Sequence, residues 1–163
     1  MTELVDDFTG AFRAHPAGVA LITATTPEGP VGLTASSVAS VSIDPPTLSF
    51  SVTKSGGSAG GVLRADSFLV HLLGESQVPL AVSFATSGAD RFTDEQEWRT
   101  LDTGEPHFPS TPVALRARAV EIVPAGSSRL VLAEVLSVHR GPSSAPLVYQ
   151  NREFHTLPVS CAV

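Results

Sequence analysis

Short apolar runs separated by turn residues recur along the chain, and this pattern predicts strands rather than long helices. The runs 19–25 (VALITAT), 48–52 (LSFSV) and 68–73 (FLVHLL) each have the length of a short strand. Residues 26–29 (TPEG) are typical of a turn, so the first run is expected to form a hairpin with the segment 31–38.

The second half of the chain also contains short segments whose apolar pattern predicts strands. In the segment 113–119, apolar residues alternate with Arg116 and Arg118, which predicts a half-exposed strand. The run 130–138 is almost continuously apolar apart from Glu134, and it predicts a strand buried on both faces. A last strand is expected at about 146–149, with Phe154 as a further candidate.

Helical spacing is confined to short segments. Residues 2–14 place Leu4, Val5, Phe8 and Phe12 on one face, which predicts an amphipathic N-terminal helix. Other short helices are expected at about 62–65 and after Ser76, where Pro79 suits the first turn. Residues 87–111 read as a polar, irregular segment.

The predicted order of elements indicates the fold class. It lacks the regular alternation of strand and helix that a doubly wound parallel sheet requires. Antiparallel strands that close into a small barrel, with Greek-key-like connections and short flanking helices, fit the order better because closure removes sheet edges. A length of 163 residues favours a single mainly β domain over residues 1–163.

Composition excludes several classes of function. A net charge of −6 and a single lysine argue against nucleic-acid binding, which needs clustered basic residues. The only cysteine, Cys161, excludes an internal disulfide and a cysteine-based zinc site. The five histidines lack the spacing of a metal site, so no metal ligand is predicted. The acidic N-terminus does not resemble a signal peptide, and a soluble, cytoplasmic protein is expected.

The stretch 31–54 is notable for small, hydrogen-bonding side chains, which let a flat ligand lie close to the backbone. It is followed by the Gly/Ser-rich segment 55–61 (SGGSAGG), whose backbone N–H groups could hold a phosphate. A Ser/Thr-rich loop and a flexible connection are the plainer interpretations of these two stretches. Together, the two stretches suit a planar, phosphorylated cofactor without identifying it.

A second chemical reading rests on residues 56–60. The sequence Gly-Gly-Ser-Ala-Gly matches the G-x-S-x-G pattern in which a serine acts as nucleophile, so Ser58 is a candidate for a hydrolase. The chain lacks the alternating units of an α/β-hydrolase sheet, and the pattern matches easily by chance in a Gly/Ser-rich loop. No G-x-G-x-x-G follows a predicted strand, so a Rossmann nicotinamide site is not indicated.

Several motifs resemble the flavin-reductase-like family of FMN-binding split barrels, in an ordered series over roughly residues 8–157. GLTASS begins at Gly32 and SVSIDPP ends at Pro46, at the spacing of that family. Further matches are the run from Phe50 to Ser55, the pair Arg91-Phe92, a GEPH segment from Gly104, and the closing segments LVLAEV and PLVYQNREFHTL.

The resemblance implies an NAD(P)H:flavin oxidoreductase that reduces FMN or FAD, supplies a partner monooxygenase and forms a homodimer. Hydride would pass from the nicotinamide to the flavin, and no catalytic side chain is assigned. The resemblance leaves FMN versus FAD and NADH versus NADPH open. It implies flavin contacts for Thr34, Ala35, Ser36, Ser37, Phe50, Ser51 and Val52, and phosphate contacts for Lys54, Ser55, Ser58, Arg91 and Phe92.

Three departures from the family pattern stand out. Gly126-Ser127-Ser128 replaces the Gly-Asp-His associated with the nicotinamide, Gly56 replaces a serine, and His71 replaces an asparagine. A flavin-binding protein without nicotinamide-dependent activity is therefore an alternative.

Overall fold

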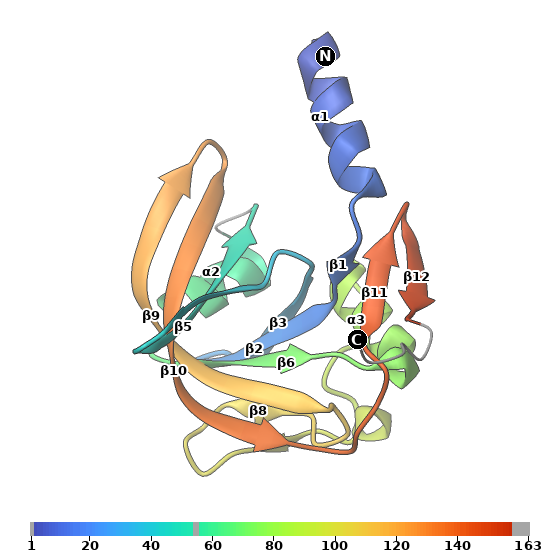
Figure 1. Cartoon of the computed structure of the whole chain (residues 1–163). Helices are drawn as coiled ribbons and strands as arrows, with labels where there is room; N and C mark the ends of the chain where they lie inside the picture. Colours follow the sequence, from blue (N-terminus) through green and yellow to red (C-terminus); the bar gives the residue numbers. More distant parts are fainter. Residues whose placement is uncertain (1, 54–55, 158–163) are drawn as a thin grey trace.

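The computed structural model describes residues 2–53 and 56–157. Its centre is a seven-stranded sheet in the order β3-β2-β6-β9-β10-β5-β4, with every neighbouring pair antiparallel (Figure 1). The mainly β, antiparallel fold predicted from the sequence is confirmed. The strands are β2 Ala20–Thr26, β3 Gly29–Ala35, β4 Ala39–Ile43, β5 Pro46–Val52, β6 Phe68–Leu72, β9 Val113–Ala125 and β10 Ser128–Arg140.

The sheet curls around one apolar core, so that β3 and β5 approach each other although neither pairs with the other in the sheet. Phe50 of β5 and Phe68 of β6 are fully buried and meet edge to face, with ring centroids 5.4 Å apart. Helix α2 (Gly57–Arg64) packs on β2 and β3 and adds Val62 to this core. The gap between β3 and β5 is the opening of the barrel.

A smaller three-stranded sheet, β1-β11-β12, lies beside the barrel and covers a second apolar cluster. Leu147 of β11 packs there with Phe84 and Phe108. The bounds of the remaining elements are β1 Ala17–Gly18, β11 Leu147–Gln150, β12 Glu153–Thr156, α3 Val78–Ala85, the 3-10 helices η1 Glu75–Gln77 and η2 Asp94–Gln96, and the short pair β7 Arg99–Thr100 and β8 Pro106–His107.

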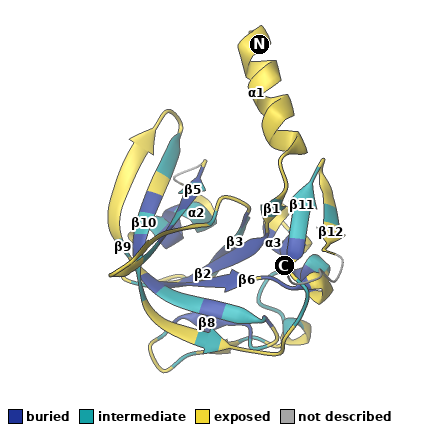
Figure 2. Cartoon of the chain, in the orientation of Figure 1, coloured by how far each residue is buried: buried dark blue, intermediate teal, exposed yellow. Residues whose placement is uncertain are grey.

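Helix α1 (Glu3–Ala14) projects away from the barrel and has no buried residue (Figures 1 and 2). Its apolar face includes Phe8 and Phe12, which are 62% and 63% exposed. Among the described residues, no helix is both long enough and apolar enough to span a membrane.

Three sequence predictions need correction. Strand β10 is not buried on both faces: Val131 and Ala133 face the core, whereas Leu130, Leu136 and Val138 are exposed on the other side. Hydropathy alone cannot distinguish a strand with two covered faces from a strand with an uncovered apolar face.

Helix α2 begins at Gly57, so most of the Gly/Ser-rich segment is helical rather than a loop. The reason is packing, because a Cβ atom on Gly61 would lie 2.9 Å from methyl groups of Thr26 and Val31. Glycine lets the helix lie directly on the β2–β3 hairpin.

The segment 87–111 is not merely polar and irregular. It contains η2, β7 and β8, and it buries Glu105, His107, Phe108 and Thr111. The exposed strand β4 was also absent from the sequence prediction, because Ala39–Ile43 is mostly serine and alanine apart from Val41 and Ile43.

Candidate flavin site

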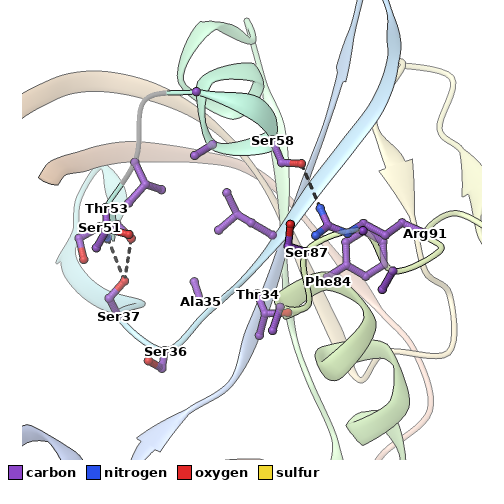
Figure 3. Close-up of a pocket in the computed structure, with 17 residues that line it drawn as sticks. Thr34, Ala35, Ser36, Ser37, Ser51, Thr53, Ser58, Phe84, Ser87 and Arg91 are labelled. Carbon is purple, nitrogen blue, oxygen red and sulfur yellow. Dashed lines mark hydrogen bonds between the residues drawn. The ribbon is translucent and has the colours of Figure 1, made fainter. Parts of the chain in front are cut away.

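A cavity of about 850 Å³ lies in the barrel opening between β3 and β5 (Figure 3). The start of α2 and the residues after α3 form its other sides. This volume lies in the range of small-molecule sites, about 300–1,000 Å³. The cavity is lined by Leu33, Thr34, Ala35, Ser36, Ser37, Ser51, Val52, Thr53, Gly56, Ser58, Ala59, Phe84, Ala85, Ser87, Gly88, Ala89 and Arg91.

The wall formed by residues 34–37 is free of bulky groups. Thr34 turns its hydroxyl to α3, where it donates to the Ala81 carbonyl at 2.7 Å, and Ala35 is almost fully buried. Gly32 lies beneath the Phe84 ring, which a Cβ atom at that position would approach to 2.6 Å. The small residues therefore let α3 approach β3 closely and leave an open, flat wall.

Two serines join the strands on either side of the opening. The Ser51 backbone N–H donates to Ser37 Oγ at 2.9 Å, and the Ser37 hydroxyl donates to the Ser51 carbonyl at 3.2 Å (Figure 3). This pair of bonds holds the end of β5 beside the chain that leaves β3. It fixes the width of the cavity without placing a large side chain in it.

Arg91 holds the opposite side of the cavity together. Its guanidinium donates to the carbonyls of Ser83, Gly32 and Thr86, and to Ser58 Oγ at 3.1 Å. The same group lies over the Phe84 ring, 5.6 Å from its centroid. Arg91 thus links α3, β3 and the first turn of α2.

The start of α2 makes this end of the cavity electropositive. Gly56 is the N-cap, and Gly57 begins the helix with a φ of +57°. The first N–H groups of a helix have no partner within the helix and carry the positive end of its dipole. With the Arg91 charge beside Ser58, they provide a place for a phosphate group.

The cavity brings together most of the predicted site residues: Thr34, Ala35, Ser36, Ser37, Ser51, Val52, Ser58 and Arg91. The side chain of Phe50 instead lies in the barrel core, where it is fully buried and packs edge to face on Phe68. Phe92 packs edge to face on Phe84 and Trp98 and does not line the cavity. Lys54 and Ser55 lie outside the described residues.

Sequence reasoning missed the contribution of α3 and the turn after it. Phe84, Ser87 and Gly88 line the cavity although they are far from the small-residue stretch in sequence. Leu80 and Phe84 are four residues apart, which indicates an apolar helix face, but the sequence does not show against which strand that face packs.

Two buried polar clusters lie outside the cavity. Glu105, 2% exposed, accepts hydrogen bonds from Ser67, Thr103 and Arg116, the last at 2.7 Å. Burial by itself raises the pKa of Glu105, but these donors outweigh it and hold the pKa below its usual value. This carboxylate stays ionised and ties the segment 103–107 to β9.

The second cluster is a stack of imidazoles. His71 and His107 stack with centroids 5.7 Å apart, and His139 lies 5.4 Å from His107. His71 bonds the Leu21 carbonyl through Nδ1 and accepts the Phe108 N–H through Nε2. Burial lowers the pKa of His71 to about 3 and, with the nearby charges of His139 and Arg99, that of His107 to about 4. Both rings are therefore neutral at pH 7.

Comparison with known proteins decides the family. The model of the flavin reductase like domain matches residues 12–158. This chain belongs to that family. The recognition made from its motifs is confirmed.

The curated relatives of this family member include two FMN reductases. It is 40% identical over 153 residues to an NADH:FMN oxidoreductase of Rhodococcus qingshengii, across 91% of this chain and 80% of that one. It is 36% identical to the FMN reductase (NADH) SmoA of Agrobacterium fabrum, across 90% of this chain and 83% of that one.

Solved structures of flavin reductases share the fold. A flavin reductase domain protein of Arthrobacter superposes with a TM-score of 0.89 at 28% identity, across 98% of this chain and 99% of that one. The styrene monooxygenase flavin reductase of Pseudomonas putida gives 0.84 at 27% identity, across 95% and 99%. The split-barrel architecture expected from the motifs is therefore confirmed.

The serine-hydrolase alternative finds no support in the geometry. Ser58 lies in the first turn of α2, and its Oγ accepts a hydrogen bond from Arg91 rather than donating one to an imidazole. A serine nucleophile needs a base within hydrogen-bond reach. Ser58 instead contributes a hydroxyl to the electropositive end of the cavity.

Proposed function

We propose that this protein is an NADH-dependent flavin reductase that reduces FMN in the cavity between β3 and β5 and supplies the reduced flavin to a separate monooxygenase. The observation that carries the proposal is a flat wall of small residues with an electropositive helix start at one end, in a chain whose relatives include NADH:FMN oxidoreductases. FAD is a second flavin that the cavity could accept.

The described residues fit an FMN molecule. The start of α2, Ser58 and the charge of Arg91 would hold its phosphate, while Ala35, Ser36 and Val52 would lie along the ring system. When bound, the flavin would supply a hydride acceptor for NADH, and with one proton from solvent the products would be NAD⁺ and reduced flavin.

None of the described side chains that line the cavity is suited to general acid–base chemistry. Among the described residues that line it, the only charged side chain is that of Arg91, whose guanidinium has N–H donors and no acceptor. The residues of this chain therefore bind, orient and partly desolvate the reactants, and we assign no catalytic residue.

The test is a steady-state assay at 340 nm with purified protein, FMN and either NADH or NADPH. The proposal expects catalytic oxidation of NADH that depends on added flavin. Flavin binding without oxidation of either nicotinamide would instead favour the alternative prompted by the missing Gly-Asp-His motif.

We also infer a homodimer. Apolar side chains remain exposed on several elements, including Phe8 of α1, Ile43 of β4 and Val138 of β10, and Ile43 is 93% exposed. Exposed apolar surface of this kind often marks an interface. Sedimentation equilibrium at micromolar concentration should give twice the mass of one chain, and a monomer would contradict the inference.

A coupled assay with a flavin-dependent monooxygenase tests whether this protein can supply such a partner with reduced flavin. Reduced flavin produced by this protein should support substrate oxidation by a flavin-dependent monooxygenase in the same vessel. A single-domain organisation and a cytoplasmic location stay predictions from the sequence.

A further inference from the structure

A cluster of aromatic rings adjoins the end of the flavin cavity that Arg91 borders. Phe92, the next residue in the chain, has its ring centroid 5.0 Å from that of Phe84, 5.1 Å from that of Trp98 and 5.9 Å from that of Phe108. Phe84 lines the cavity, whereas Phe92 packs against the second apolar cluster. The neighbours Arg91 and Phe92 therefore lie in different surroundings, one at the cavity and one at the core.

The backbone at Phe92 has a conformation that bulky residues rarely adopt. Its φ is +57°, in the left-handed region, where the Cβ atom crowds a carbonyl oxygen. The Trp98 indole N–H donates to the Phe92 carbonyl at 2.8 Å and helps to hold this conformation. Glycine or asparagine would meet the backbone requirement with less strain. The turn alone therefore does not explain a phenylalanine at this position, and a role for its ring is indicated.

The Phe84 ring connects Phe92 to Arg91. It meets the Phe92 ring edge to face. The guanidinium carbon of Arg91 lies 5.6 Å from the Phe84 ring centroid, and Figure 3 shows the two side chains together. On β3, a Cβ atom at Gly32 would approach the Phe84 ring to 2.6 Å, so little space remains between ring and strand. Contacts with β3 and with Phe92 therefore fix the ring on which the guanidinium lies.

The orientation of the guanidinium decides which groups Arg91 reaches. Its Nη1 donates to the Gly32 carbonyl and to Ser58 Oγ, each at 3.1 Å. A planar group at the end of a long side chain makes both bonds only while its plane is held, and the Phe84 ring offers a face for that plane. Displacement of this ring would tilt the guanidinium and move its charge away from Ser58 and the start of α2.

We propose that Phe92 is a positioning residue for the phosphate end of the flavin cavity. Through the Phe84 ring and the backbone that it shares with Arg91, Phe92 holds the guanidinium beside Ser58 and the first turn of α2. The inference rests on the proposed function, because it requires FMN to bind in this cavity with its phosphate at this end. Loss of the Phe92 ring should impair binding of the phosphate and spare binding of the flavin ring system.

A comparison of FMN with riboflavin separates positioning from general packing, because riboflavin has the same ring system and ribityl chain without the phosphate. The variant is Phe92→Leu, since leucine stays apolar and unbranched at Cβ but removes the ring. Phe92→Tyr is the conservative variant, because it keeps the ring. Phe154→Leu is the matched control: Phe154 is also half-buried against the second apolar cluster, but its ring pairs with Tyr149 and does not line the flavin cavity.

Phe92→Leu should raise the dissociation constant for FMN by roughly tenfold and that for riboflavin by less than about twofold. Phe92→Tyr and Phe154→Leu should both keep the wild-type preference for FMN over riboflavin, even if their Tm falls. Flavin fluorescence measures binding, and thermal melting checks folding. If Phe92→Leu does not fold, Trp98→Phe takes its place, because it removes the N–H bonded to the Phe92 carbonyl and keeps an aromatic ring. The same selective loss of FMN binding is then expected.

A loss confined to FMN supports the positioning role. Equal weakening of FMN and riboflavin would show a packing role alone and overturn the inference, as would unchanged binding of both or a wild type without preference for FMN. These results leave the proposed function standing as long as the wild type oxidises NADH with FMN. A wild type that binds neither flavin overturns both claims.

Discussion

Arg91 has two roles, one in hydrogen bonding within the protein and one in the predicted phosphate contact, and the sequence alone could not separate them. The resemblance to flavin reductases predicts a phosphate contact, but the structure shows this side chain donating hydrogen bonds to four partners within the protein. The guanidinium has five N–H groups, so most are already used. Arg91 therefore shapes the site first and contributes its charge second.

Replacing Arg91 by lysine separates these roles. Lysine keeps the charge but lacks the planar fork, so Arg91→Lys should leave several carbonyls without their donor and lower the stability by about 2 kcal/mol. The first turn of α2 should lose its support, and the FMN dissociation constant should rise roughly tenfold or more. Chemical denaturation and flavin titration measure the two effects.

The matched control is Arg118→Lys. Arg118 forms one exposed ion pair with Glu134 at 2.8 Å, and such pairs contribute little. If Arg91→Lys behaved like Arg118→Lys in both measurements, the bracing role of Arg91 would be wrong.

At the scale of elements, the sequence predicted those strands whose formation depends mainly on a local run of apolar residues. The apolar runs at 19–25, 48–52 and 68–73 form β2, β5 and β6 because an alternating or apolar run needs only a sheet to join. The family motif also located most of the cavity wall. The exposed apolar face of β10 was not predicted, because the burial of that face depends on whether another element covers it.

Long-range contacts could not be predicted either, because they depend on residues that are distant in the sequence. The ion pair between Glu105 and Arg116 connects strand β9 to a segment whose sequence looks irregular. The hydropathy pattern gives no indication of this pair. The Ser37–Ser51 bonds require the curl of the whole sheet. The sequence analysis predicted ligand contacts for these serines, but it did not predict the hydrogen bonds that join them across the barrel opening.

The packing of α2 gives a test at this scale. Gly61→Ala improves helix propensity but puts a Cβ atom 2.9 Å from Thr26 and Val31, so we expect a loss of about 1–3 kcal/mol from overpacking. Gly10→Ala in α1 is the matched control, because nothing lies within 4 Å of its Cβ position. The control should be stabilised by up to about 1 kcal/mol.

Thermal melting distinguishes the two glycine variants. Opposite shifts in Tm are expected, and Gly61→Ala should also bind FMN more weakly because α2 is displaced. Stabilisation of both variants would show that α2 does not pack on the hairpin as described.

The whole molecule should lose stability in acid. The pKa values of His71 and His107 are lowered to about 3 and about 4, so the unfolded chain binds protons that the folded protein does not. Above the unfolded pKa of about 6.5, both histidines are neutral in both states and do not reduce the stability. Below it, protonation of the unfolded chain lowers the free energy of unfolding progressively as the pH falls. Each buried imidazole can cost up to about 1.4 kcal/mol per pH unit in this window. Below the ordinary pKa of a glutamate, Glu105 adds a loss of the same sign.

Urea denaturation at pH 7.5, 6 and 5 measures this slope. His71→Asn removes one buried imidazole, so its free energy of unfolding should depend less steeply on pH even if the variant is less stable throughout. Ser40→Asn changes an exposed residue without adding or removing a titratable group, so it should keep the wild-type slope. Equal slopes for all three proteins would contradict this account of acid stability.

The central claim is that the small-residue wall between β3 and β5 holds the flavin, and Ser36→Trp tests it most directly. Ser36 is exposed and lines the cavity, so an indole there fills the space without entering the core. Ser40→Trp on the exposed strand β4 is the control, because Ser40 does not line the cavity. Titration of FMN, followed by flavin fluorescence, should show micromolar binding by the wild type and the control, and binding weaker by roughly tenfold or more by Ser36→Trp. Wild-type affinity in Ser36→Trp, with the fold intact, would contradict the claim.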